Sequence, residues 1–90
     1  MQFEWDEDKN QENIKKHGLS FQDAEAVFDD PVRIECFDST HSANEERFIT
    51  IGLAEEVIVV VYTERKEIIR IISARKATKE EERRYINGYS

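Results

Sequence analysis

Three arginines lie in or beside the most β-prone part of the chain and are the first candidates for chemistry. Arg65, Arg70 and Arg75 occupy or follow two runs rich in valine and isoleucine, residues 57–64 and 67–74. Such runs are typical of inner strands, where an unpaired guanidinium group is very costly to bury. Arginines held on a rigid sheet could instead bind phosphate, because their planar forks match its oxygens without a metal. Ion pairs with neighbouring glutamates, or with carboxylates of the acidic half of the protein, are the alternative.

Proton transfer would fall to histidine, whose unperturbed pKa lies near neutrality. The chain has two histidines, His17 and His41. His17 follows Lys16 at the expected end of a helix, where the helix dipole favours a cation, so capping is the alternative to catalysis. His41 lies in a polar loop, where it could equally be a solvated residue. Tyr85, in the last predicted helix, could reach the sheet as an acid or base, or simply pack against it.

Metal and cofactor chemistry have no sequence support. The single cysteine, Cys36, cannot form an internal disulfide, and with the two histidines it makes no helical or Cys-x-x-Cys ligand pattern. This spacing matches no zinc-ligand pattern. The sequence also lacks a glycine-rich phosphate loop and a Gly-x-Ser-x-Gly motif. We therefore expect neither a metal nor an organic cofactor.

The charge of the chain is unevenly distributed. The net charge is −7, yet the first sixty residues carry five lysines and arginines against fifteen carboxylates, whereas the last thirty carry eight against five. The carboxyl-terminal third is thus a basic region on an acidic protein. This asymmetry is compatible with a local anion site and also with docking of a basic partner, and it does not select between them.

The size and the apolar pattern predict one cytoplasmic domain. Ninety residues suit a single core, and the longest apolar run, Val57 to Tyr62, is far too short to span a bilayer. The first residues, Met1 to Asp6, have neither the basic start nor the apolar stretch of a secretory signal. We expect no membrane association.

Capping residues mark three helices. Asp6 can cap a polar helix that runs to about His17, with Gly18 placed to end it. Ser20 with Asp23 resembles a capping box for a second helix, which ends before Pro31. Thr78 and Glu81 form a second such box. It begins a last, short and charged helix that contains Arg84, Tyr85 and Ile86.

Between these helices the period of apolar residues changes to two, which predicts strands. The predicted strands are residues 3–5, 32–37, 47–53, 57–64 and 67–74, the last two forming a hairpin around Arg65 and Lys66. The expected fold class is α+β, with two N-terminal helices on one face of a mainly antiparallel sheet of about four strands and a short C-terminal helix. The predicted core is Phe21, Phe28, Ile49, Ile51, Val59, Val61 and Ile72.

Short motifs along nearly the whole chain resemble the BrnT toxins of bacterial type II toxin–antitoxin pairs. The amino-terminal motifs are Phe3-x-Trp5-Asp6-x-x-Lys9, Asn13, Lys16-His17-Gly18-x-x-Phe21, Ala24 and Phe28-x-Asp30-Pro31. They continue, in order, with His41, Glu46-Arg47-Phe48, Gly52, Thr63-x-Arg65 and Arg70-Ile71-Ile72-Ser73-Ala74-Arg75-x-Ala77. One departure is Lys66, where relatives often carry glycine in the hairpin turn, and it puts the turn type in doubt.

The resemblance implies a RelE-like fold for residues 1–90 as one toxin domain. It also implies a ribonuclease that arrests translation and a BrnA antitoxin partner that carries the operator-binding domain. On this basis the toxin would contact RNA directly and DNA only through the antitoxin. The alternative is a non-catalytic acidic module that binds another protein and whose arginines are structural.

Cleavage of RNA without a metal needs few groups, because the 2′-hydroxyl supplies the nucleophile. The enzyme must provide a base for that hydroxyl, cations for the pentacoordinate phosphorane and an acid for the leaving oxygen. With the resemblance, the predicted catalytic residues are Arg65, Arg75, His17 and His41. The predicted substrate-binding residues are Arg70, Lys16 and Tyr85.

Overall fold

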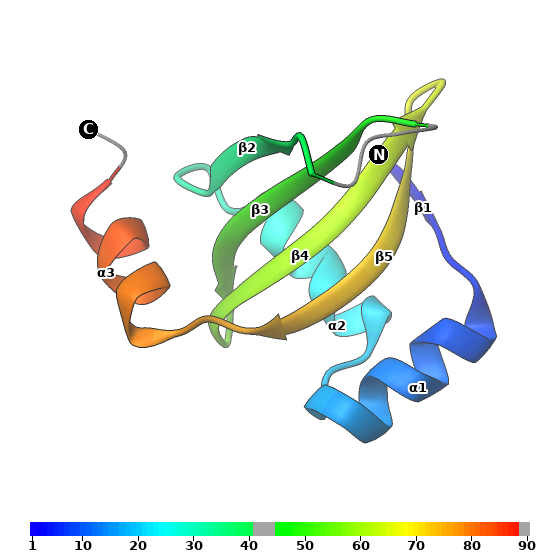
Figure 1. The fold of residues 1–90 in the computed structure, drawn as a ribbon, viewed down its shortest axis with the longest axis horizontal. Helices are drawn as coiled ribbons and strands as arrows, with labels where there is room; N and C mark the ends of the chain where they lie inside the picture. The colour runs from blue at the N-terminus through cyan, green and yellow to red at the C-terminus, as the bar shows by residue number, and fades with distance from the viewer. Residues whose placement is uncertain (41–44, 89–90) are drawn as a thin grey trace.

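The computed structural model describes residues 1–40 and 45–88. This part of the chain forms a five-stranded sheet with four helical segments around it (Figure 1). In chain order the elements are β1 (Gln2–Glu4), α1 (Glu7–His17), α2 (Phe21–Ala24), the 3₁₀ helix η1 (Glu25–Asp29), β2 (Ile34–Asp38), β3 (Arg47–Ala54), β4 (Glu56–Arg65), β5 (Ile68–Lys76) and α3 (Lys79–Asn87). No helix in the described part of the chain is long and apolar enough to cross a membrane.

The sheet is an antiparallel meander to which one parallel strand is added. Strands β2 to β5 pair in sequence order, and β1 lies at the outer edge of β5, so that the strand order is β1-β5-β4-β3-β2. The parallel pairing covers only three residues and begins with Gln2 opposite Ile68. The predicted α+β class and the order of the elements are confirmed. The sheet has one strand more than the four or so that we predicted.

The predicted helix ends are also confirmed. The Asp6 carboxylate accepts hydrogen bonds from the backbone N–H groups of Asp8 and Lys9, at 2.9 and 3.3 Å. Gly18 ends α1 with φ of +71° and donates its N–H to the carbonyl oxygen of Ile14. A positive φ is easy only for glycine, which explains why the helix ends there. The second predicted helix is α2, continued by η1 as a tighter turn.

The main core lies on the face of the sheet that α2 and η1 cover. Its sheet residues are Ile58, Val60, Tyr62, Ile69, Ile71 and Ala74, and its helical residues are Phe21, Ala24, Val27 and Phe28. Our predicted core was wrong about the sheet face. Ile51 and Val59 point to the other face, and Ile49, Val61 and Ile72 are only half-buried. The run from Val57 to Tyr62 is apolar at every position. It therefore has no alternation of polar and apolar residues that would show which face of the sheet the helices cover.

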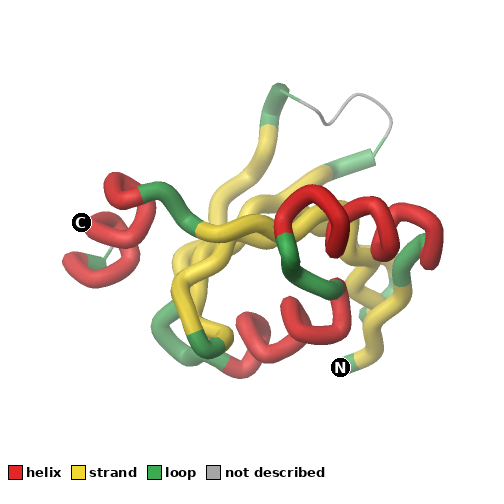
Figure 2. The backbone as a smooth tube through the Cα atoms, turned by 90° about the horizontal axis from the view of Figure 1, so that it is seen from below, coloured by secondary structure: helices red, strands yellow, loops and turns green. Residues whose placement is uncertain are grey.

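The second face of the sheet, here called the open face, is covered at one end by α3. Beneath that helix lies a small apolar cluster of Ile34, Ile51 and Val59, against which Tyr85 packs. Figure 2 shows α3 set apart from the other helices, and Figure 1 looks onto the open face with α2 behind the sheet. Over the rest of the open face, toward the β4–β5 hairpin, the described residues form no helix.

Asp30 joins α3 to the end of η1. Its carboxylate accepts hydrogen bonds from the backbone N–H groups of Val32 and Leu53 and from the Tyr85 hydroxyl, the last at 2.5 Å. Burial opposes ionisation of Asp30, but the hydrogen bonds from Tyr85 and the backbone outweigh it and lower the pKa of the carboxyl. Gly52 lies beside this junction, where a Cβ atom would come within 2.8 Å of Val27 Cγ1. Only glycine therefore lets η1 pack so closely on β3.

The β4–β5 hairpin turns one residue later than the sequence predicted. The two turn residues are Lys66 and Glu67, with φ of +48° and +72°. Positive φ at both central positions is the pattern of a type I′ turn, whose twist matches that of the flanking strands. Such a turn favours asparagine and glycine, so this chain forms it with two residues that are strained in that conformation.

Candidate functional site

The arginines that the sequence singled out do not converge on one site. Arg65 lies opposite Ile68 beside the hairpin turn, whereas Arg75 lies opposite Val59 near the other end of the sheet. Six residues of β4 separate these two positions, which corresponds to roughly 20 Å. A single phosphate cannot contact both guanidinium groups at that separation. Arg70, opposite Thr63, lies in the half of β5 nearer the hairpin.

Each of these arginines is paired with a carboxylate. The pairs join Arg65 to Glu45 at 2.6 Å, Arg70 to Glu4 at 3.0 Å and Arg75 to Glu81 at 2.8 Å. The ion-pair alternative thus describes the arrangement, although none of the partners is a neighbour in sequence. The Arg65–Glu45 pair is largely exposed and contributes little to stability.

Arg75 ties α3 to the sheet. Its guanidinium donates two parallel hydrogen bonds to Glu81, from Nη1 to Oε1 and from Nη2 to Oε2, at 2.8 and 2.9 Å. The same glutamate accepts the backbone N–H of Thr78, whose hydroxyl accepts the N–H of Glu81 in return. The hydrogen bond from Arg75 is the largest cause that lowers the pKa of Glu81 to about 2. Arg75 therefore has a structural role at the start of α3.

A small pocket lies between the C-terminal part of α1 and strand β5. It has a volume of about 240 Å³ and is lined by Lys9, Glu12, Asn13, Lys16, His17, Ile72 and Ser73. Lys9 and Lys16 are seven residues apart and so fall on one face of the helix, beside His17 in the last turn. Two of the sequence-predicted residues, His17 and Lys16, thus meet here. Lys9 and Ser73 also line the pocket but were not among the predicted site residues, although the seven-residue spacing of the two lysines was a usable signal.

Asn13 holds this end of α1 in place. Its side-chain amide donates to the carbonyl oxygens of Leu19 and Ala74, both at 2.8 Å, and its Oδ1 accepts the N–H of Ala74 at 3.2 Å. The side chain thus pairs with the edge of β5 beyond the reach of β1, as a neighbouring strand would. Asn10 bonds similarly to the backbone N–H of Phe21. Ile14 is the only aliphatic or aromatic residue of α1, so buried amides, not an apolar stripe, dock this helix.

A β-bulge shapes the β5 side of the pocket. Tyr62 pairs with Ile71 and Val61 pairs with Ser73, so Ile72 is the extra residue between them. A bulge bends its strand and changes the direction of nearby side chains, and bulges are common next to active sites. Here it places Ile72 and Ser73 at the wall of the pocket that faces α1.

The pocket has the groups that phosphate chemistry requires. Lys9 and Lys16 supply positive charge, the His17 imidazole can accept or donate a proton, and the Ser73 hydroxyl can donate a hydrogen bond. Glu12 adds a carboxylate at the rim. Among residues 1–40 and 45–88, no cluster of histidine, cysteine and acidic side chains is placed to hold a metal ion.

Two other sequence-predicted residues lie elsewhere. His41 is outside the described residues. Tyr85 lies on α3, where its ring packs on the cluster under that helix and its hydroxyl donates to Asp30. Tyr85 does not line the pocket between α1 and β5.

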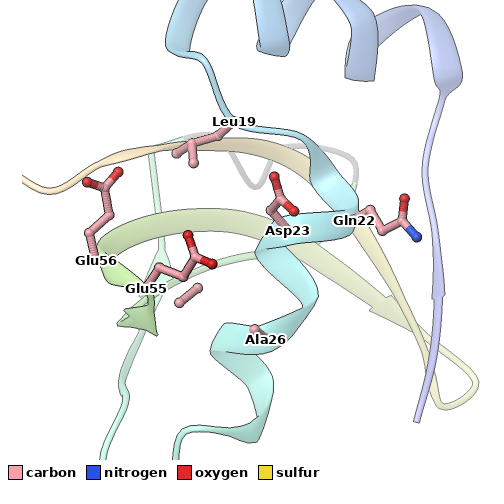
Figure 3. A pocket seen from close by; sticks show the side chains of 7 residues that line it. Leu19, Gln22, Asp23, Ala26, Glu55 and Glu56 are labelled. Carbon is pink, nitrogen blue, oxygen red and sulfur yellow. The ribbon is translucent and has the colours of Figure 1, made fainter.

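A larger hollow lies between α2 and the β3–β4 turn and is acidic. It measures about 480 Å³ and is lined by Leu19, Gln22, Asp23, Ala26, Ala54, Glu55 and Glu56. Figure 3 shows the three carboxylates of Asp23, Glu55 and Glu56 around it. Like charges there would repel a phosphate, so this hollow does not suit RNA. Its small apolar floor and acidic rim suit a basic side chain instead.

Comparison with known proteins identifies the family. No curated protein sequence matches the chain. The family described as the ribonuclease toxin BrnT of type II toxin–antitoxin systems matches residues 5–81. This range includes α1, the whole meander and the pocket between α1 and β5. The match favours a ribonuclease over a non-catalytic binding module. The chain belongs to the BrnT family of ribonuclease toxins of type II toxin–antitoxin systems.

Proposed function

We propose that this toxin is a metal-independent endoribonuclease whose reaction takes place in the pocket between α1 and β5. The observation that carries the proposal is the meeting of His17 with Lys9 and Lys16 against the bulge of β5. These residues supply a titratable group and two cations at one place, as metal-free cleavage of RNA requires. Arrest of translation would follow from the loss of intact RNA.

The proposed reaction needs one proton taken and one proton given. A base removes the proton of the 2′-hydroxyl, and that oxygen attacks the adjacent phosphorus. The bond to the 5′-oxygen of the next nucleotide then breaks, and this oxygen takes a proton from an acid. The products are a 2′,3′-cyclic phosphate and a 5′-hydroxyl. His17 performs one of the two transfers, and His41 remains the candidate for the other.

The cations act on the charge that develops at phosphorus. Lys9 and Lys16 approach from one face of α1, and the Ser73 hydroxyl approaches from β5. Arg75 lies two residues beyond Ser73, and we retain it as a candidate cation for the phosphates of the same RNA strand. Arg65 and Arg70, near the hairpin, could contact only more distant parts of the RNA.

The test is cleavage of RNA by purified protein in the presence of EDTA, with the chemical ends of the products identified. We expect cleavage to continue and to leave cyclic phosphates. His17→Gln and Lys16→Gln should each reduce kcat about a hundredfold, since a general acid–base or a transition-state cation typically contributes that much. Lys15→Gln is the matched control, because Lys15 lies in the same turn of α1 but does not line the pocket. Loss of cleavage in EDTA with recovery in Mg²⁺ would exclude the metal-free mechanism.

We further propose that the antitoxin is of the BrnA type and that it docks through a basic segment. The acidic hollow supports this, since its lining combines three carboxylates with the apolar side chains of Leu19, Ala26 and Ala54. Glu55→Lys with Glu56→Lys should weaken co-purification with the antitoxin, most strongly at low salt, where charge attraction is least screened. Unchanged co-purification would remove the hollow from the interface. The antitoxin, not the toxin, would contact DNA.

A further inference from the structure

A row of polar side chains crosses the open face of the sheet, one from each strand. In register from edge to edge the row is Asp38, Arg47, Thr63, Arg70 and Glu4. Residues directly opposite one another point to the same face, with Cβ atoms about 5 Å apart. Arg47 and Arg70 are therefore the two cross-strand neighbours of Thr63, one on each side.

The order of charges in the row is acid, base, hydroxyl, base, acid. Both acids of the row, Asp38 and Glu4, lie on the edge strands, outside the two arginines. Arg70 uses Nη1 to donate to Glu4 at 3.0 Å, and a guanidinium group has five N–H donors. Two like charges on either side of a neutral hydroxyl repel each other, and an anion bound between them would relieve that repulsion.

Thr63 provides an independent indication of a ligand. It is 1% exposed, and its hydroxyl has no hydrogen-bond partner among the described residues. Valine has nearly the same shape and a higher strand preference, so threonine adds only hydrogen-bonding capacity at this position. The Thr63 hydroxyl, with arginines on both neighbouring strands, can therefore donate a hydrogen bond to an anion.

We propose that Arg47, Thr63 and Arg70 form a second phosphate-binding site, which holds the RNA backbone away from the bond that is cut. The inference rests on the proposed function, because Arg70 is three residues from Ser73 in the α1–β5 pocket. That separation is roughly 10 Å along β5, so one RNA strand lying along β5 meets both sites. On a protein of net charge −7, a local cation pair is needed to hold RNA against the general repulsion.

Binding of a short, uncleavable 2′-O-methyl oligonucleotide tests the site, measured by fluorescence anisotropy at several salt concentrations. Arg70→Gln and Arg47→Gln should each weaken binding about tenfold, the size of a lost charged hydrogen bond. Each should also reduce the slope of log K against log salt by about 0.7 for the lost phosphate contact. Thr63→Val should weaken binding about threefold, while Glu4→Gln should strengthen it, since it removes the carboxylate that competes for Arg70. Arg83→Gln, which removes an exposed charge on α3, is the control and should leave the slope unchanged.

Cleavage kinetics separate this site from the catalytic pocket. Variants in the row should raise KM and leave kcat near that of the wild type, because they act away from the reacting bond. If the wild type binds the oligonucleotide and the row variants bind with the same affinity and slope, the inference is wrong. If instead the variants bind RNA normally and lose only the binding of the antitoxin, the row binds a protein carboxylate, and the inference is equally wrong. A wild-type protein that binds RNA through the row but does not cleave it would contradict the proposed function alone.

Discussion

Replacing Asn13 by alanine should detach the end of α1 from the sheet. The substitution removes three hydrogen bonds to the backbone of Leu19 and Ala74, from a side chain that is 7% exposed. A buried backbone group that loses its partner costs about 1–3 kcal/mol, although water entering from the adjacent pocket offsets part of this. We expect a loss of about 3 kcal/mol in the free energy of unfolding, which is a large share of the stability of a domain of this size.

Asn10→Ala is the matched control for this prediction. Asn10 lies in the same helix and is equally buried, but it bonds to the backbone N–H of Phe21, away from the pocket. It should cost about 1–2 kcal/mol, because one backbone donor loses its partner. Urea denaturation measures both variants, and RNA cleavage well below the unfolding midpoint measures their activity. For each kcal/mol of lost stability, Asn13→Ala should lose far more activity than Asn10→Ala, because His17 and Lys16 shift when the end of α1 detaches. Equal losses of activity, or wild-type stability of Asn13→Ala, would refute the reasoning.

Three further predictions concern the stability of the fold. The Glu81 carboxyl has a pKa of about 2 in the folded protein against an ordinary 4.5. Its stabilising effect is therefore complete above pH 4.5 and is lost as the pH falls toward 2. Between these pH values the stability of Glu81→Gln, followed by circular dichroism, should fall less steeply with pH than that of the wild type. Glu67→Gly should raise the melting temperature by about 4–8 °C, because it relieves a residue held at φ of +72° and a strained position of this kind costs about 1 kcal/mol. Gly52→Ala should lower the free energy of unfolding by about 1–3 kcal/mol in urea titrations, because its Cβ would lie 2.8 Å from Val27.

The sequence could predict the elements that depend on neighbouring residues. The caps of α1, α2 and α3 and the order of the meander follow from local signals, namely Asp6, Ser20, Thr78 and the spacing of apolar residues. The parallel pairing of β1 could not be predicted in this way. Its three residues meet a strand more than sixty positions away, and no local pattern encodes that contact.

The candidate site was less predictable, for two different reasons. The separation of Arg65 and Arg75 was implied by the predicted hairpin itself, because one arginine adjoins the turn and the other lies at the far end of the returning strand. For the pocket at His17, the spacing of Lys9 and Lys16 indicated a shared helix face, but no local pattern placed that face against β5. It depends on a polar helix that docks through Asn13, whereas sequence reasoning looks for an apolar stripe to predict which face of a helix is buried.

The distance in sequence between the two walls of the pocket sets when the pocket can exist. His17 is made early in synthesis, whereas Ile72 and Ser73, on the opposite wall, are made more than fifty residues later. At the usual speed of translation this interval is on the order of several seconds. A nascent chain that stops anywhere before β5 lacks the pocket altogether. On the proposed function, a chain that stops before β5 would not cleave RNA, and only a chain extended through β5 would need an antitoxin.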